Sequence, residues 1–384
     1  MASINAGATF KVSRKNPELI RPAKPTPHEL RILSDIDDQD GLRFQMPLIL
    51  IYRHSPSMEG RDPVRVIRDA VAEALADADA TLQQLGTLLP PIQNLRELLY
   101  DVPGVAGVID CPLMLIQENL PVVLNALLSY QFGRDISSVL VTPPRVTFRH
   151  TEHDIVIDTK RTTIPHDRMM RHFFFGPTEI SILRQSLPPH LHSCSRFQIV
   201  TACMWRCRTI ATLSHPNEDV RLLCVVNIRK RLNPPLREGY YGNAIVYPAA
   251  VTTAEKLLEN PLHYAVELVK KAIHEATEEY VKSVVDLMVL RGRPNLTGAR
   301  TYLVSYAKGF EEVDVGWGKP AYGGVARGGV DSFPRAVSYF MSFKNSKGED
   351  GIMVPLCLPP KAMDVLIHEL QKMLLGRSSI ASAL

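Results

Sequence analysis

The spacing of apolar residues predicts that strands and helices alternate along most of the chain. Almost continuous apolar runs from Phe44 to Tyr52 and from Leu222 to Ile228 are typical of buried strands. Between Ser195 and Thr212 apolar side chains recur at helical spacing, which indicates a helix. From Leu262 to Leu290 one apolar stripe continues, so the pattern predicts a single long helix whose charged residues face water.

Shorter apolar segments extend this pattern through both halves of the chain. Strands are predicted at residues 108–116, 173–176, 301–306 and 351–357, and helices at residues 177–185 and 362–375. A helix is also expected after Asp62–Pro63, continuing to Leu75. Another is expected within residues 118–140, where the apolar residues at helical spacing are Leu120, Val123, Leu124 and Leu127. Strands and helices mixed in this way predict an α/β fold.

Composition and charge narrow the class of protein. With 384 residues, 45% apolar and 22% charged, the chain is long enough for two globular domains. A formal charge of +4 is too small over this length to indicate a nucleic-acid partner. Because no run of about 18 apolar residues occurs and the first residues are polar, we expect a cytoplasmic protein without a membrane partner. The six cysteines show no paired metal-binding spacing, so no metal site is predicted.

A short motif follows the strand predicted at residues 301–306. It contains Asp314, Gly316, Trp317 and Gly318 within five positions. Glycines allow the backbone positive φ or close approach to another segment, a buried indole needs a partner for its N–H, and a buried carboxylate needs a cation. On residue chemistry alone, the motif indicates a turn with a packed tryptophan.

This motif also resembles the Asp-Phe-Gly-Trp-Gly motif of the BAHD family, plant acyltransferases that move an acyl group from coenzyme A to an alcohol or amine. Three further stretches resemble the family and occur in its order: Thr26–Arg43, Val225–Asn243 and Gly351–Pro360. The resemblance extends to the subgroup of benzyl alcohol O-benzoyltransferases and alcohol acyltransferases. It is interrupted after Leu75 and after Gln117, where two blocks of the family pattern are missing.

The resemblance implies a two-domain, CoA-dependent acyltransferase-like α/β fold with mixed sheets and an incomplete N-terminal domain. The expected division is a shortened N-terminal domain at residues 1–145, a crossover at 146–172 and a C-terminal domain at 173–384. It further implies acyl-CoA as co-substrate, a small alcohol as acceptor, no permanently bound cofactor, and a monomer. In the family the second motif is structural, and its aspartate binds an arginine, which implies a pair between Asp314 and Arg229.

Acyl transfer to an alcohol needs a base for the hydroxyl proton, and histidine suits this role because its pKa lies near neutrality. The family uses the histidine of a His-x-x-x-Asp-Gly loop, which the interrupted region lacks. A literal His-x-x-x-Asp spacing occurs at His150 and Asp154, which are the candidate catalytic residues. Yet they follow the start of the expected crossover, and no glycine follows Asp154, so a chance occurrence is the competing interpretation.

Two hypotheses about function remain. In the first, the chain is an alcohol O-acyltransferase that forms an ester from an acyl-CoA such as benzoyl-CoA or acetyl-CoA, with catalysis impaired because the histidine loop is missing. In the second, it is an inactive, truncated family member that acts at most as a binding or interaction protein. The second rests on the two missing blocks, since the loss of central strands exposes sheet edges.

Overall fold

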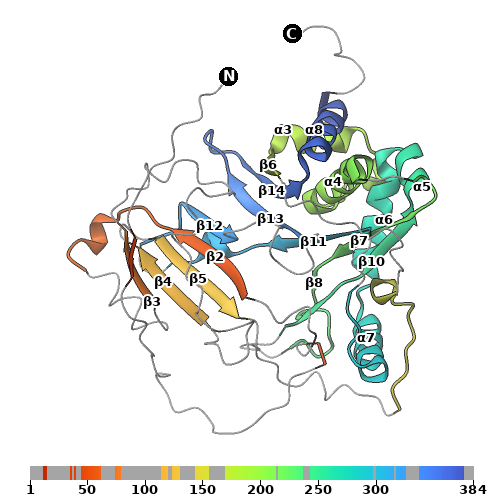
Figure 1. Ribbon diagram of the computed structural model, residues 1–384, viewed down its shortest axis with the longest axis horizontal. Coiled ribbons are helices and arrows are strands. Elements are labelled where there is room, and N and C mark those ends of the chain that lie inside the picture. Colours follow the sequence, from red (N-terminus) through yellow and green to blue (C-terminus); the bar gives the residue numbers. More distant parts are fainter. Residues whose placement is uncertain are drawn as a thin grey trace. The chain divides into compact units, whose positions relative to one another are not determined.

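The computed structural model of the chain describes residues 12–14, 35–36, 39, 45–61, 74–78, 114–119, 123–129, 143–154, 169–212, 215–236, 243–296, 300–314, 317–325 and 337–375 (Figure 1). These residues fall into two compact units. The first unit comprises residues 1–32, 42–131 and 307–328, and the second comprises 33–41, 132–306 and 329–384. The division into residues 1–145, 146–172 and 173–384 stays a prediction.

The first unit contains a sheet of six strands in the order β1-β3-β4-β5-β2-β12. Their bounds are β1 Val12–Arg14, β3 Ala74–Ala78, β4 Met114–Asn119, β5 Val123–Ser129, β2 Gln45–Ile51 and β12 Tyr322–Val325. Strands β3 and β4 are parallel, whereas β2 lies antiparallel to both β5 and β12. Ile49 and Ile51 of β2 are fully buried, as expected for a central apolar strand. Two 3-10 turns, η2 Pro56–Met58 and η6 Phe310–Glu312, complete the described part of this unit.

Two helix predictions in this unit are wrong. Residues 123–129 form β5, which pairs along its length with both β2 and β4. A short apolar run fits a helix face and a buried strand equally well, and here pairing on both sides decides for the strand. Ala74 and Leu75 lie in β3 rather than at the end of a helix. The rest of that predicted helix, residues 62–73, lies outside the described residues. Of the strand predicted at 108–116, residues 114–116 lie in β4 and the others lie outside the described residues.

The second unit is built on another six-stranded sheet, in the order β10-β7-β11-β13-β14-β6. Its strands are β10 Ala249–Thr253, β7 Asp219–Cys224, β11 Thr301–Ala307, β13 Val337–Lys344, β14 Asp350–Leu358 and β6 Met169–Phe175. Strands β7 and β11 are parallel, while β10 with β7, β13 with β14, and β14 with β6 are antiparallel. A two-stranded ribbon joins β8 Val226–Asn227 to β9 Ile245–Val246. The mixed sheets confirm the α/β prediction.

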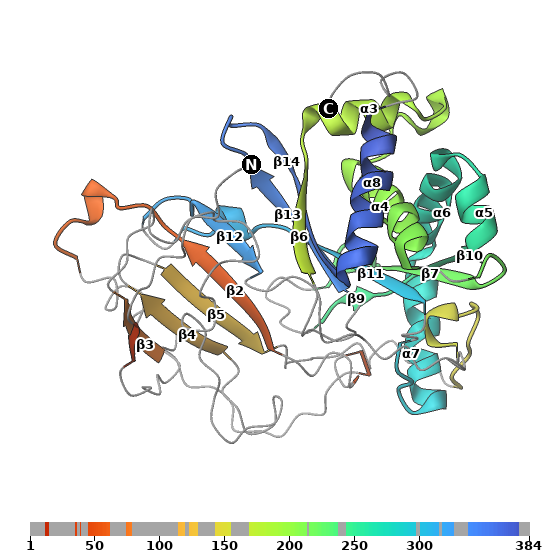
Figure 2. The ribbon, with the colours of Figure 1, turned by 45° about the horizontal axis from the view of Figure 1, so that its top comes forward.

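Helices cover both faces of this second sheet (Figures 1 and 2). They are α3 Pro177–Gln185, α4 Arg196–Thr212, α5 Ala254–Glu259, α6 Leu262–Glu275, α7 Glu278–Arg291 and α8 Pro360–Leu375. Helix α4 packs against α6 and α8 on one face, whereas α7 lies on the other. Trp205 of α4 is almost completely buried, which places α4 at the centre of this layer. Within the described residues, no helix combines the length and apolar character needed to cross a bilayer.

The single long helix predicted from Leu262 to Leu290 is in fact two helices. Helix α6 ends at Glu275, and α7 begins after Thr277, whose side chain accepts a hydrogen bond from the backbone N–H of Tyr280 at 3.3 Å. Threonine is a favoured N-cap because its oxygen satisfies one of the first free N–H groups of a helix. The apolar stripe continues across the break because both helices bury a face, so the pattern alone did not reveal it.

Gly351 of β14 generates a prediction about stability. A Cβ at this position would lie 2.4 Å from two ring atoms of Phe174 and 2.6 Å from the carbonyl oxygen of Phe175. We expect Gly351→Ala to lower the free energy of unfolding by about 1–3 kcal/mol, because the clash involves backbone as well as a packed ring. Urea denaturation measures this, with exposed Lys347→Ala as the control. Equal effects of the two changes would contradict the packing described here.

Candidate functional site

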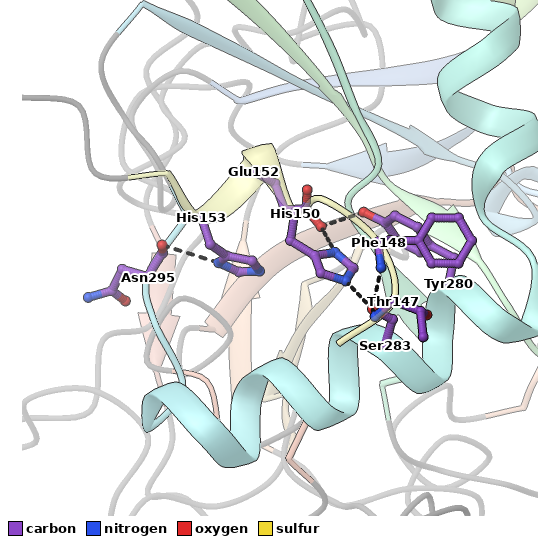
Figure 3. Close-up of polar contacts among 8 residues, drawn as sticks. All are labelled: Thr147, Phe148, His150, Glu152, His153, Tyr280, Ser283 and Asn295. Carbon is purple, nitrogen blue, oxygen red and sulfur yellow. Dashed lines mark hydrogen bonds and ion pairs between the residues drawn. The ribbon is translucent and has the colours of Figure 1, made fainter. Parts of the chain in front are cut away.

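The segment that contains His150 and Asp154 is docked onto helix α7 by hydrogen bonds from its backbone (Figure 3). The Ser283 hydroxyl accepts from the backbone N–H groups of Thr147, at 2.9 Å, and Phe148, at 3.0 Å. The Asp286 carboxylate accepts from the backbone N–H of Arg145 at 2.8 Å. Both side chains are buried on a helix face that is otherwise apolar. Backbone donors that are partly buried need partners, and these two side chains supply them.

His150 is 5% exposed, and both of its ring nitrogens have partners within the second unit. Nδ1 lies 2.9 Å from Oε1 of Glu152, and Nε2 lies 2.8 Å from Oγ of Ser283. Because the two backbone N–H groups occupy both lone pairs of Oγ, the serine must donate its proton to Nε2. Nδ1 then carries the hydrogen and donates to Glu152. This assignment makes Nε2 of His150 the acceptor and Nδ1 the donor.

Glu152 is the acceptor at the other end of this chain of hydrogen bonds. Its Oε1 accepts from His150 and also from the hydroxyl of Tyr280, on the first turn of α7. Burial, and then the charge of Glu152, raise the pKa of Tyr280 far above its ordinary value, so the hydroxyl stays protonated and donates. The Tyr280 ring also packs edge-on against His150, with ring centroids 4.9 Å apart, and against Phe148, at 5.5 Å.

The order Ser283–His150–Glu152 is the hydrogen-bond order of a Ser-His-acid catalytic triad. A catalytic serine, however, must expose its oxygen to the substrate. Ser283 is 1% exposed, and two backbone N–H groups already occupy its oxygen. The arrangement therefore holds protons in fixed positions, which suits a structural role. We call Ser283, His150 and Glu152, with the backbone groups bound to Ser283, the clamp. His150 as a catalytic base stays a prediction, and the geometry favours the competing structural interpretation.

Asp154 and His153 make separate contacts around the 3-10 turn η4, Thr151–His153. The Asp154 carboxylate lies 3.8 Å from the guanidinium of Arg149 and 4.0 Å from that of Arg221, a buried residue of β7. Nδ1 of His153 lies 3.3 Å from the carbonyl oxygen of Asn295. Burial, partly opposed by the charge of Glu152, lowers the pKa of His153, so this buried imidazole stays neutral near pH 7.

The loop of the second motif belongs to the first unit. The Asp314 carboxylate accepts from the backbone N–H of Gly318 at 2.9 Å, and Gly318 has φ of +82°, which favours glycine. The hydroxyl of Tyr52 donates to the carbonyl oxygen of Val313 at 2.7 Å. Burial, and then the charge of Asp314, raise the pKa of Tyr52. Trp317 is 8% exposed, which agrees with a packed tryptophan in a turn.

Two parts of the second-motif prediction are not tested by these contacts. Gly316 lies outside the described residues. Arg229 is half-buried in the second unit, where its backbone N–H donates to the side chain of Asn227 at 2.9 Å. The pair between Asp314 and Arg229 stays a prediction.

An open hollow of about 400 Å³ lies elsewhere in the second unit, where α6 meets α7. Its lining includes Gln198, Arg231 and Glu278. The Arg231 guanidinium donates to the carbonyl oxygens of Ile273, at 2.8 Å, and Ala276, at 2.9 Å. The Arg231 guanidinium thus binds free carbonyl groups at the carboxyl end of α6, where the helix dipole favours positive charge.

Ser283, Glu152 and Tyr280 did not emerge from the sequence as site residues. The available signal was a pair of polar residues, Ser283 and Asp286, that interrupts an apolar stripe. Such an interruption indicates that a buried helix face meets polar groups. It does not identify them, because the partners lie more than 130 positions away along the chain.

The clamp generates a prediction about stability. We expect Ser283→Ala to lower the free energy of unfolding by roughly 1–3 kcal/mol, because two partly buried N–H groups and the buried His150 ring lose their partner. Ser181→Ala on the exposed side of α3 is the matched control: it makes the same change within a helix, and we expect an effect within about 0.5 kcal/mol. Urea denaturation of both variants provides the comparison. A Ser283 variant as stable as the Ser181 variant would contradict the clamp.

A family model and several curated relatives match this chain. Residues 125–373 match the model of the Transferase family. Benzyl alcohol O-benzoyltransferase of Petunia hybrida is 49% identical over 438 residues, covering 97% of this chain and 95% of the relative. The Nicotiana tabacum protein of the same name is also 49% identical, covering 95% and 94%. Alcohol acyltransferase 1 of Actinidia chinensis var. chinensis is 41% identical, covering 97% and 96%.

Solved structures support the fold. Vinorine synthase aligns with a TM-score of 0.67 at 20% identity, covering 94% of this chain and 98% of that protein. TRI101 of F. sporotrichioides, solved with coenzyme A and T-2, aligns with a TM-score of 0.61 at 15% identity, covering 88% and 96%. The family match and the near-full-length identities show that this chain belongs to the Transferase family of BAHD acyltransferases.

Proposed function

We propose that the chain has the scaffold of an acyl-CoA-dependent alcohol O-acyltransferase, which forms an ester from an acyl-CoA and a small alcohol. One observation carries the proposal: the chain is 49% identical to two benzyl alcohol O-benzoyltransferases over almost its whole length. Benzoyl-CoA and acetyl-CoA are the donors to test first, since a (Z)-3-hexen-1-ol acetyltransferase of Arabidopsis thaliana is also 39% identical. Acyl-CoA is a co-substrate in this proposal rather than a bound cofactor.

We further propose that turnover by this chain is weak or absent. Ester formation needs a base that takes the alcohol proton, and such a base contributes about 10²–10⁴-fold to the rate. The family's histidine loop is missing from its expected place after Gln117. The alignment with the Petunia protein is 438 residues long whereas this chain has 384, which supports a shortened chain. His150 offers no free ring nitrogen, because Ser283 and Glu152 occupy both.

An alternative is that the chain is catalytically inactive and acts at most as a binding or interaction protein. The intact architecture of the second unit favours this alternative over complete misfolding. Its sheet has six paired strands and a buried core that includes Phe340, Leu222 and Ile352. Binding of CoA without turnover would be its experimental sign.

An activity assay separates these outcomes. The purified chain is incubated with benzoyl-CoA or acetyl-CoA and a panel of small alcohols, and ester formation and CoA release are both measured. We expect turnover far below that of the Petunia enzyme measured in parallel, because a positioned base is missing. Calorimetric titration with CoA then tests whether the scaffold still binds the co-substrate. A folded chain with neither turnover nor CoA binding would contradict the proposed scaffold.

The role of His150 is tested by comparing two variants that break the same clamp. His150→Ala removes the histidine, whereas Ser283→Ala disrupts its hydrogen bonds and leaves the imidazole in place. If His150 is structural, any residual turnover per folded molecule falls similarly in both. Robust turnover that only His150→Ala abolishes would overturn this view and make the crossover histidine the catalytic base.

A further inference from the structure

Three sulfur atoms meet in the core of the second unit, where α4 packs against α8. Sγ of Cys207 lies 3.5 Å from Sδ of Met373, and Sγ of Cys203 lies 4.0 Å from the same atom. The two cysteines are four positions apart on α4, so they lie on one side of that helix. Both thiols are free and fully buried, and Met373 is half-buried in the last turn of α8. The chemistry discussed above uses none of these residues.

The distances from Sδ of Met373 to the two cysteine sulfur atoms suit a three-coordinate metal ion. Metal–sulfur bonds of about 2.3 Å, as in zinc–thiolate sites, place three donors around a trigonal ion about 4 Å apart. The two distances to Met373 are close to this separation, so no large movement of α8 is needed.

The types of donor restrict the ion. Thiolates and a thioether are soft ligands, which favour Cu(I) among the biological metals. Within the described residues, no group of three or more His, Cys, Asp or Glu is placed to hold a metal ion, so the fourth ligand of a structural zinc site is not provided there. A monovalent ion with low coordination number therefore fits better than zinc.

Arg206, between the two cysteines in sequence, supplies positive charge near both thiols. Its guanidinium is held in place because it donates to the carbonyl oxygen of Leu257 and to others at the end of α5. In the metal-free state, the thiols of Cys207 and Cys203 both donate to Sδ of Met373. Any ion that binds must therefore displace protons, and the fixed guanidinium offsets part of the negative charge that results.

We propose that Cys203, Cys207 and Met373 form a binding site for one Cu(I)-type cation. Two S–H bonds break, two metal–thiolate bonds form, and the Met373 thioether donates a lone pair as the third bond. Two protons leave for each ion bound, and no electron is transferred.

The test is an anaerobic competition for Cu(I) between the full-length reduced chain and the chromophoric chelator bicinchoninate. We expect the chain to withdraw one equivalent of Cu(I), with release of two protons. X-ray absorption should show three sulfur neighbours at about 2.3 Å. Met373→Leu conserves core volume and keeps both thiols, and we expect it to weaken binding by at least about tenfold and to remove one sulfur neighbour.

Cysteine variants provide the matched control. The double change Cys203→Ala and Cys207→Ala should abolish withdrawal of Cu(I), whereas Cys224→Ala, which removes an equally buried thiol from β7, should leave it unchanged. Circular dichroism checks that each variant is folded. The proposal is overturned if the unaltered chain leaves Cu(I) on the chelator, or if Met373→Leu binds as tightly as the unaltered chain with the same number of sulfur neighbours.

Discussion

One constraint fixes how residues 145–148 lie on α7: partly buried backbone N–H groups packed against a helix need hydrogen-bond acceptors, and the helix backbone cannot provide them. The carbonyl groups within α7 are used by its own turns. The acceptors for residues 145, 147 and 148 therefore come from side chains, the carboxylate of Asp286 and the hydroxyl of Ser283. As a consequence, α7 has two polar residues on its buried face. They fix the position of the segment at residues 145–154, called the connecting segment below.

The same constraint explains what becomes of the literal His-x-x-x-Asp spacing. Because the Ser283 hydroxyl accepts hydrogen bonds from two backbone N–H groups, it donates its own hydrogen bond to Nε2 of His150. Nδ1 of that ring then donates to Glu152. A general base needs a free lone pair within reach of its substrate. The contacts of His150 instead use both ring nitrogens, and the bond to Ser283 joins the segment that contains His150 and Asp154 to α7. Asp154, at the far end of the turn, faces the guanidinium groups of Arg149 and Arg221.

The family relationship adds a contrast between the two halves of the chain. Most of the residues that match the Transferase model lie in the second unit, where helices cover both faces of a mixed sheet. In the first unit, the described elements are strands and 3-10 turns. A shared fold does not by itself establish shared chemistry, which depends on the residues of the site.

Much of the fold could be predicted from the sequence because most elements have a single clear period. Residues 177–185 form α3 as predicted, and the predicted strand at 44–52 contains β2. Prediction failed where two structures share one pattern. Residues 123–129 are apolar enough for either a helix or a buried strand, and the break at Ala276–Thr277 lies within a continuous apolar stripe.

The site was harder to predict than the fold. His150 was found from its spacing to Asp154, but its partners on α7 become visible only when segments 133 positions apart are brought together. Local pattern carries no information about such pairs. Conversely, the pair between Asp314 and Arg229 follows from the family resemblance alone, and the contacts described for each residue neither include nor replace it.

The central claim is that the connecting segment is locked onto α7 by the Ser283 hydroxyl. Amide hydrogen exchange at Thr147 and Phe148 tests this most directly, because it reports on the two N–H groups that donate hydrogen bonds to the hydroxyl. We predict that both amides exchange as slowly as those in the middle of α7, although they lie outside any helix or strand. Exchange as fast as in an exposed loop such as that around Lys347 would show that the segment is not held there, and would contradict the account.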